Sequence, residues 1–95
     1  LMKLFVTQRA EKNFDLIIAY IQQKWGEKTT KEFILKVDQI FKLLKLHPLM
    51  GNIEIKDIRG FQLTRQTRIL YRVSNNKIII ISFLDVRKDP KKRFK

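Results

Sequence analysis

Residues 67–73 read TRILYRV, and this stretch decides the fold because it alternates like a strand with one buried face. Successive side chains of a strand point to opposite faces of the sheet. One face is apolar and carries Ile69, Tyr71 and Val73. The other face carries Arg68 and Arg72. The pattern predicts a sheet that is packed on one side and presents guanidinium groups on its open side.

A first amphipathic helix is predicted before this strand. A short apolar run at residues 3–6 precedes Thr7, a suitable helix N-cap, and Gly26 is typical of a helix end. The apolar residues between them recur at helical spacing and form one stripe: Ala10, Phe14, Ile17, Ile18, Ile21 and Trp25. We therefore expect Trp25 to lie in the core or to close the connection to the next helix.

A second helix follows at once. Thr29 and Glu32 are three residues apart, as in a capping box, and predict its start. Its apolar stripe continues with Phe33, Val37, Ile40, Phe41 and Leu44. His47 and Pro48 close it, and His47 is expected to be a C-terminal helix residue rather than an acid or base. Two helices with a short connection should form an antiparallel hairpin.

The second half of the chain is predicted to form the sheet. Strands are expected at about 53–56, 61–65 and 68–73, and the turn sequence at 74–77 precedes a last strand at 78–84. The last strand begins with four isoleucines, so both of its faces are apolar and it should lie in the middle of the sheet.

These elements predict an α+β fold in a single domain, residues 1–95, with an N-terminal strand and an α-helical hairpin packed on one face of a small antiparallel sheet. A hydrophobic content of 44% with only 3 Gly and 2 Pro indicates an ordered chain. The chain has no cysteine, which excludes disulfides, and no apolar run long enough to span a membrane. We expect a soluble cytoplasmic protein without a membrane partner.

The charge is large and uneven. The formal net charge is +12, which favours a nucleic-acid or acidic protein partner over a role in solubility alone. Arg9 is the single arginine of the first half, whereas the second half contains Arg59, Arg65, Arg68, Arg72, Arg87 and Arg93. Because a guanidinium group can bind a phosphate or carboxylate in two places, this enrichment predicts a site in the second half.

Five segments carry a family likeness: AEKNFDLIIAYIQQKWGE at 10–27, HPLMG at 47–51, IRGFQL at 58–63, RILYRV at 68–73 and IIIISFLDVRKDP at 78–90. With them, nearly the whole chain resembles the RelE/ParE superfamily of bacterial type II toxins, which includes plasmid stabilisation proteins. Each motif is weak alone, and their order carries the resemblance. It implies a growth-inhibiting toxin held inactive by a cognate antitoxin in a hetero-oligomer.

Two activities follow from the resemblance. RelE-like members cleave messenger RNA in the ribosomal A site, and ParE-like members inhibit DNA gyrase; a shared fold cannot choose between them. Arg68 and Arg87 match arginines that would be catalytic in a RelE-like nuclease. The lysines of that pattern fall near Gly60 and Gln62 and are missing, and Phe94 lies where a tyrosine or histidine would be sought.

Further basic residues are candidates for target binding: Lys56, Arg59, Arg65, Arg72, Lys91, Lys92 and Arg93. The alternatives are a solvated loop for residues 56–59 and a solvated basic arm for the C-terminal segment. With one histidine and scattered glycines, the sequence predicts no metal site and no phosphate-binding loop, so we expect no cofactor.

The combined interpretation is a type II toxin, with ParE-like gyrase inhibition favoured slightly. RNA cleavage requires groups that accept and donate protons. His47, Tyr20 and Tyr71 are not expected on the open face of the sheet, which makes a RelE-like nuclease harder to explain. The RelE-like ribosome-dependent endoribonuclease is the first alternative, so whether the protein is an enzyme stays open. A non-toxic basic nucleic-acid-binding module is the second.

Overall fold

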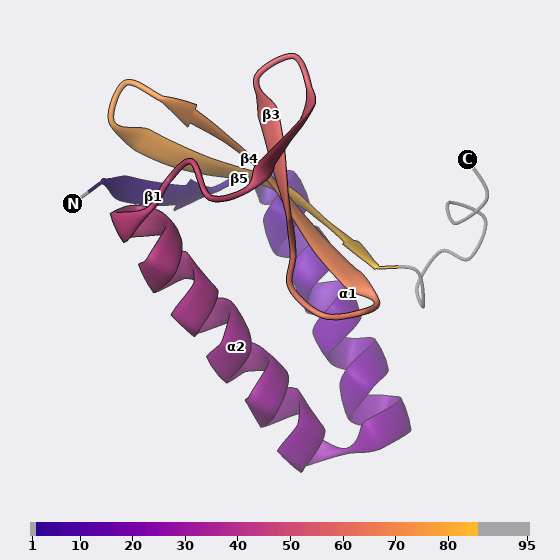
Figure 1. Cartoon of the computed structure of the whole chain (residues 1–95). Helices are drawn as coiled ribbons and strands as arrows, with labels where there is room; N and C mark the ends of the chain where they lie inside the picture. Colours follow the sequence, from indigo (N-terminus) through magenta and orange to yellow (C-terminus); the bar gives the residue numbers. More distant parts are fainter. Residues whose placement is uncertain (1, 86–95) are drawn as a thin grey trace.

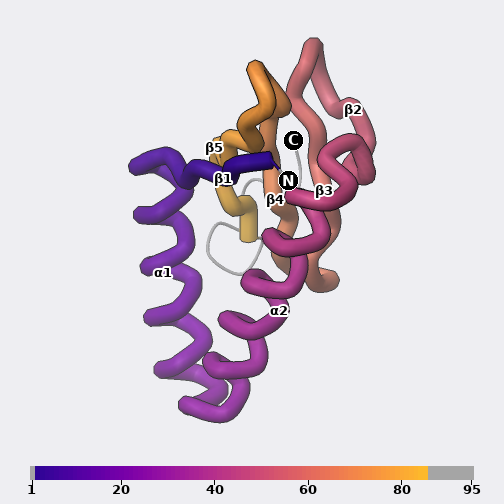
Figure 2. The backbone as a smooth tube through the Cα atoms, turned by 90° about the vertical axis from the view of Figure 1, so that its left-hand side faces the viewer, coloured from indigo at the N-terminus to yellow at the C-terminus, as the bar shows by residue number. Residues whose placement is uncertain are grey.

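The computed structural model describes residues 2–85 (Figure 1). Its elements follow one another as β1 (Lys3–Val6), α1 (Gln8–Trp25), α2 (Glu27–Leu46), β2 (Asn52–Ile55), β3 (Ile58–Gln62), β4 (Thr67–Ser74) and β5 (Lys77–Asp85). The helices form a hairpin that is closed at one end and reaches the sheet at the other (Figure 2). The predicted α+β fold is confirmed.

The five strands form one sheet in the order β1-β5-β4-β3-β2. The strands β2 to β5 pair antiparallel in sequence order, and β1 joins parallel to β5. The last strand therefore lies inside the sheet, between β1 and β4, as its apolar sequence predicts. The edges of the sheet are β1 and β2.

The core lies between the sheet and the helical hairpin. Ile69 and Tyr71 of β4 are fully buried, as the alternation in TRILYRV predicts. They pack in one cluster with residues of both helices, including Ile17, Ile21 and Leu44. Arg68 and Arg72 lie on the opposite face of β4 and are only partly buried. The helices thus cover one face of the sheet.

A bulge in β5 changes which residues of that strand face the core. Leu70 pairs with Ser82 and Tyr71 pairs with Ile80, so β5 contains one extra residue at this point. Ile78 and Ile80 are fully buried before the bulge, and Phe83 is buried after it. The bulge shifts the inward positions of β5 by one residue and keeps apolar side chains on the core at both ends.

The predicted start of the second helix is wrong. Helix α2 begins at Glu27, and Gly26 is both the C-cap of α1 and the N-cap of α2, with φ of 93°. A single glycine in this left-handed conformation reverses the chain between the helices, so Thr29 lies inside α2 and cannot cap it. The hydroxyl of Thr30, not Thr29, donates a hydrogen bond to the Gly26 carbonyl at 2.9 Å.

Two other expectations need correction. Trp25 is 57% exposed, so it is not a core residue. Strand β3 covers Ile58–Gln62 and not 61–65. The chain leaves β3 early because the Thr64 hydroxyl accepts hydrogen bonds from the N–H groups of Gln66 and Thr67, at 3.2 and 3.0 Å, and forms a turn there.

Candidate functional site

The face of the sheet turned away from the helices is the candidate site, and we call it the outer face. It carries Arg68, Leu70 and Arg72 of β4, paired across the sheet with Gln62, Gly60 and Ile58 of β3. The positions near Gly60 and Gln62, where a RelE-like pattern has lysines, thus lie beside Leu70 and Arg68. In this chain Gln62 provides a neutral amide and Gly60 has no side chain, so neither position carries the positive charge of a lysine.

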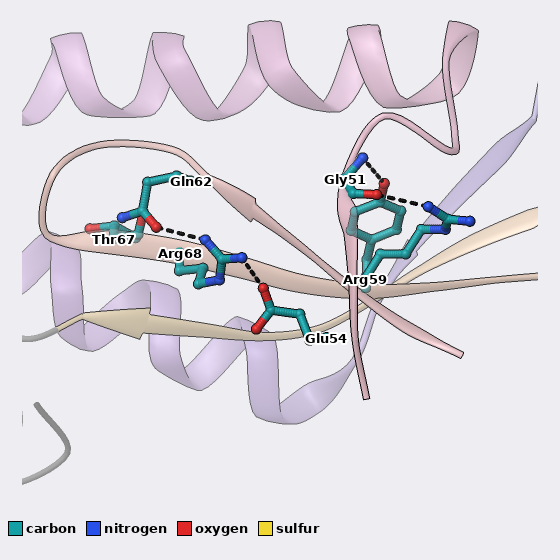
Figure 3. Close-up of polar contacts among 7 residues, drawn as sticks. Gly51, Glu54, Arg59, Gln62, Thr67 and Arg68 are labelled. Atoms are coloured by element: carbon teal, nitrogen blue, oxygen red, sulfur yellow. Dashed lines mark hydrogen bonds and ion pairs between the residues drawn. The ribbon is translucent and has the colours of Figure 1, made fainter. Parts of the chain in front are cut away.

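Arg68 is held by two side chains on the outer face (Figure 3). Its Nη1 donates to the Oε1 of Gln62 at 2.7 Å, and its Nη2 forms an ion pair with the Oε2 of Glu54. The side chains of Arg68 and Glu54 are 29% and 32% exposed. The guanidinium group is therefore accessible from solvent, and a carboxylate already occupies part of its binding surface.

Gly60 makes this contact possible, because Glu54 reaches Arg68 from β2, with β3 lying in between. A Cβ atom at position 60 would stand 2.6 Å from the Cδ of Glu54 and 2.8 Å from the Nη2 of Arg68. Any side chain here would push the two groups apart. Glu54 thus contacts Arg68 across Gly60, near which a RelE-like pattern would have a lysine.

Arg72 also has an acidic partner. Its Nε lies 3.2 Å from the Oδ2 of Asp57, in the turn between β2 and β3, and the two side chains are 42% and 67% exposed. Both arginines of the outer face are therefore next to carboxylates that come from β2 or the turn after it. Such exposed pairs contribute little to stability.

Arg59, predicted to bind the target, instead contacts the loop after α2. Its Nη1 donates to the carbonyl oxygen of Gly51 at 2.8 Å and to that of Leu49 at 3.2 Å. Figure 3 shows the guanidinium group of Arg59 beside Gly51, away from Arg68. Arg59 thus has a structural role in the loop and does not join Arg68 and Arg72.

The remaining predicted basic residues fall in two turns of the sheet and in the segment outside the described residues. Lys56 is exposed in the β2–β3 turn, and Arg65 is exposed in the β3–β4 loop. Arg87, Lys91, Lys92 and Arg93 lie outside the described residues. The structure thus brings together Arg68 and Arg72 on one face, with Lys56 at the turn beside it.

The groups that could transfer protons lie elsewhere in the described part of the chain. Tyr71 is buried on the helix side of the sheet, and burial raises its pKa above the ordinary value, against smaller lowering effects from the Gly51 hydrogen bond and the Arg59 charge. Tyr20 belongs to α1, and His47 follows the end of α2. Among residues 2–85, no histidine or tyrosine lies on the outer face.

The sequence did not predict that Glu54 belongs to this site, although its carboxylate pairs with Arg68. Glu54 lies between Ile53 and Ile55, so alternation alone could have placed it on the opposite face from two apolar residues. Its contact with Arg68 crosses β3, which lies between β2 and β4, and depends on the absence of a side chain at Gly60. No local sequence signal reports such a contact.

The helix side of the sheet has an apolar hollow. Its volume is about 230 Å³, and it is lined by Val6, Glu11, Phe14, Val37, Phe41 and Phe83.

Within residues 2–85, no three acidic or histidine side chains are grouped as metal ligands. Neither described helix is long and apolar enough to cross a membrane.

Several solved structures with a similar fold bear the names of toxins or toxin–antitoxin systems. A chromosomal ParDE system from P. aeruginosa matches with a TM-score of 0.75 and 20% identity, covering 88% of this chain and 95% of that one. A YoeB/ParE toxin from Agrobacterium tumefaciens gives 0.65 and 18%, covering 88% and 98%. A heterotetrameric YoeB-YefM toxin–antitoxin complex from Staphylococcus aureus gives 0.60 and 17%, covering 88% and 95%. At these identities the likeness shows the fold.

The sequence, together with this fold, shows the class of protein, a RelE/ParE-like toxin. The model of the ParE toxin of the type II toxin–antitoxin system parDE matches residues 4–90, and the chain belongs to this family. Among curated proteins, none matches the sequence. The resemblance to type II toxins is confirmed.

Proposed function

We propose that this toxin acts as a ParE-like inhibitor of DNA gyrase. The observation that carries the proposal is the match of residues 4–90 to the ParE toxin family model. The structural neighbours include both ParDE and YoeB proteins, so the fold supports a toxin without choosing its target.

The chemistry of the outer face supports the same choice. Cleavage next to a 2′-hydroxyl group needs a proton acceptor and a proton donor, each worth about 10²- to 10⁴-fold in rate. Among the described residues, Arg68 and Arg72 are not accompanied there by a histidine or tyrosine. Guanidinium groups can bind and stabilise anions, and that role suits an inhibitor that binds its target without cleaving it.

RelE-like cleavage of messenger RNA is the second candidate. The observation that favours it is the place of Arg68 on the outer face of β4, the middle strand of the sheet, where the RelE-like pattern has an arginine. In that case Arg68, with Arg87 outside the described residues, would hold the scissile phosphate. The non-toxic nucleic-acid-binding module loses weight because the chain belongs to a toxin family.

A cognate antitoxin is the expected partner, and the proposal places it over exposed apolar surface. Four large apolar residues between the end of α2 and the end of β2 are 60–62% exposed: Leu46, Leu49, Ile53 and Ile55. Strand β2 is also an edge strand. An exposed edge with apolar side chains is a surface that a partner segment can cover.

Two parallel reactions test the proposal. Purified antitoxin-free protein is added to a DNA gyrase supercoiling reaction, and to a cell-free translation reaction whose messenger 5′ ends are mapped afterwards. Loss of supercoiling with intact messenger is the expected result. Discrete cuts in ribosome-bound codons with normal supercoiling would replace the proposal by RelE-like cleavage, and no effect in either reaction, with normal growth on expression, would favour a non-toxic module.

A further inference from the structure

We propose that Glu54 is an internal competitor for Arg68, which keeps the guanidinium group of the free toxin from a nucleic-acid phosphodiester until the carboxylate is displaced. The inference rests on the proposed function only in taking the outer face as the target surface. It concerns binding, and it holds for a toxin that acts on DNA with gyrase or on messenger RNA.

The carboxylate of Glu54 lies at the guanidinium group of Arg68. Glu54 binds the Nη2 of Arg68 while Gln62 binds the Nη1 at 2.7 Å. Both outer nitrogens of the fork therefore have acceptors. A phosphate that binds the fork in two places needs the Nη2 donor and the positive charge that Glu54 already engages, so phosphate and Glu54 compete for Arg68.

The ion pair between Glu54 and Arg68 is weak. Arg68 and Glu54 remain about one-third exposed, and ion pairs at such positions contribute little to folding stability. A polyanion can therefore displace the carboxylate at small cost. Gln62 is neutral and can stay, because its Nε2 donates to the carbonyl oxygen of Thr64 at 2.6 Å and so keeps its Oε1 directed at Arg68.

Gly60 leaves open the space beside the ion pair of Glu54 and Arg68. A Cβ atom there would come within 2.6 Å of the Cδ of Glu54, yet the neighbours are the flexible ends of side chains. Gly60 thus leaves the space in which the carboxylate lies. Substitution of Gly60 by alanine should displace the carboxylate without changing the net charge, and removal of the charge by Glu54→Gln should have the same consequence.

The test is the affinity for a labelled single-stranded DNA of about ten nucleotides, within the usual length range of such sites. Wild type, Glu54→Gln and Gly60→Ala are compared by fluorescence anisotropy at about 0.1 M salt, where long-range charge effects are damped. We expect Glu54→Gln to bind about two- to fivefold more tightly, because a competing ion pair of modest strength is lost. Gly60→Ala should change the affinity in the same direction.

Two controls separate this effect from net charge. Glu27→Gln removes the same charge and breaks an exposed ion pair with Lys31, at 3.5 Å, on α2. It should change the affinity less than twofold, since it lies away from the outer face. In an Arg68→Ala background, Glu54→Gln should give no gain, because no guanidinium group is left to release. Circular dichroism confirms that each variant is folded.

An equal gain from Glu27→Gln, or a gain that persists without Arg68, would overturn the inference. So would no gain from Glu54→Gln, including the case in which neither protein binds. The result is independent of the toxin's target. A wild type that leaves gyrase active refutes the proposed function, whereas the affinity ratio of Glu54→Gln to wild type decides the role of Glu54.

Discussion

The hydroxyl group of Tyr71 accepts a hydrogen bond from the N–H of Gly51 and donates one to the carbonyl of Pro48, each at 2.8 Å. Tyr71 lies in the central part of the sheet, and residues 48–51 form the loop after α2. The phenol therefore connects the end of the helical hairpin to β4. Arg59 contacts the same loop through the carbonyl oxygens of Leu49 and Gly51. Two segments of the family resemblance, at 47–51 and 68–73, meet at this point.

Tyr71→Phe should destabilise the protein by about 1–3 kcal/mol, because it leaves a buried N–H and a carbonyl without their partner. The aromatic ring and its packing are retained, so the fold should persist. Urea unfolding followed by circular dichroism measures the change. A loss below about 0.5 kcal/mol would mean that water replaces the hydroxyl at both groups.

The same residue predicts a pH effect at the alkaline end. Burial raises the pKa of Tyr71 above its ordinary value of 10.0, so the folded state holds the phenol proton more tightly than the unfolded state. The contribution to stability is fully present below pH 10 and is lost as the pH rises through the folded pKa. Unfolding free energies measured between about pH 9 and pH 11 should fall less steeply in Tyr71→Phe than in wild type. Parallel curves would contradict the assignment.

Gly51→Ala should be more damaging than Gly60→Ala. A Cβ atom at position 51 would lie 2.7 Å from the hydroxyl of Tyr71 and 2.8 Å from the carbonyl oxygen of Gly60. That oxygen belongs to the backbone of β3 and cannot move aside easily, so we expect a loss of about 1–3 kcal/mol, as in overpacked cores. At Gly60 the close atoms are side-chain ends, which can rotate away. Thermal unfolding of both variants gives the comparison, and equal losses would show that the loop yields as readily as a side chain.

Thr7→Ala and Thr29→Ala form a matched pair. The hydroxyl of Thr7 accepts from the N–H of Ala10 at 3.1 Å and donates to the carbonyl of Ile81 at 2.9 Å. Its loss should lower stability by about 1–2 kcal/mol, as for other N-caps. Thr29 is exposed within α2, so its replacement should change stability by less than about 0.5 kcal/mol. Chemical unfolding of both variants decides the matter, and a large effect at Thr29 would restore the capping box.

Arg59→Lys should loosen the loop after α2. The Nη1 of Arg59 alone contacts both carbonyl oxygens, and a lysine lacks the rigid guanidinium plane that directs this nitrogen toward them, so backbone amides at 49–51 should exchange hydrogen faster. Arg65→Lys, in the exposed β3–β4 loop, is the control and should leave that exchange unchanged. Hydrogen exchange by NMR provides the measurement. Unchanged exchange combined with lost toxicity in Arg59→Lys would return Arg59 to the target-binding surface.

Local patterns in the sequence were enough for the main elements. The apolar spacing of residues 10–21 and 33–44 predicts both helices, since helical faces repeat over a few residues. The alternation in TRILYRV places Ile69 and Tyr71 inside and Arg68 and Arg72 outside, because the period of a strand is also local. The boundaries were less well predicted. Gly26 and Thr64 ended elements through particular backbone conformations and hydrogen bonds. The capping-box match at Thr29, three residues after Gly26, could not reveal the glycine cap.

The sequence by itself thus determined the buried face of β4, the order of helices and strands, and the arginines on the outer face of that strand, although it misplaced Trp25. Only the tertiary structure decided what those arginines contact. Glu54 and Arg68 are 14 residues apart and on strands that are not neighbours, and they meet because the sheet order puts β3 between them with a glycine at the crossing point. Arg59 likewise joins a loop because of the register of β2 and β3. Side-chain periodicity is a property of a few adjacent residues, whereas the partner of a charged group depends on strand order, register and the space left by a third residue.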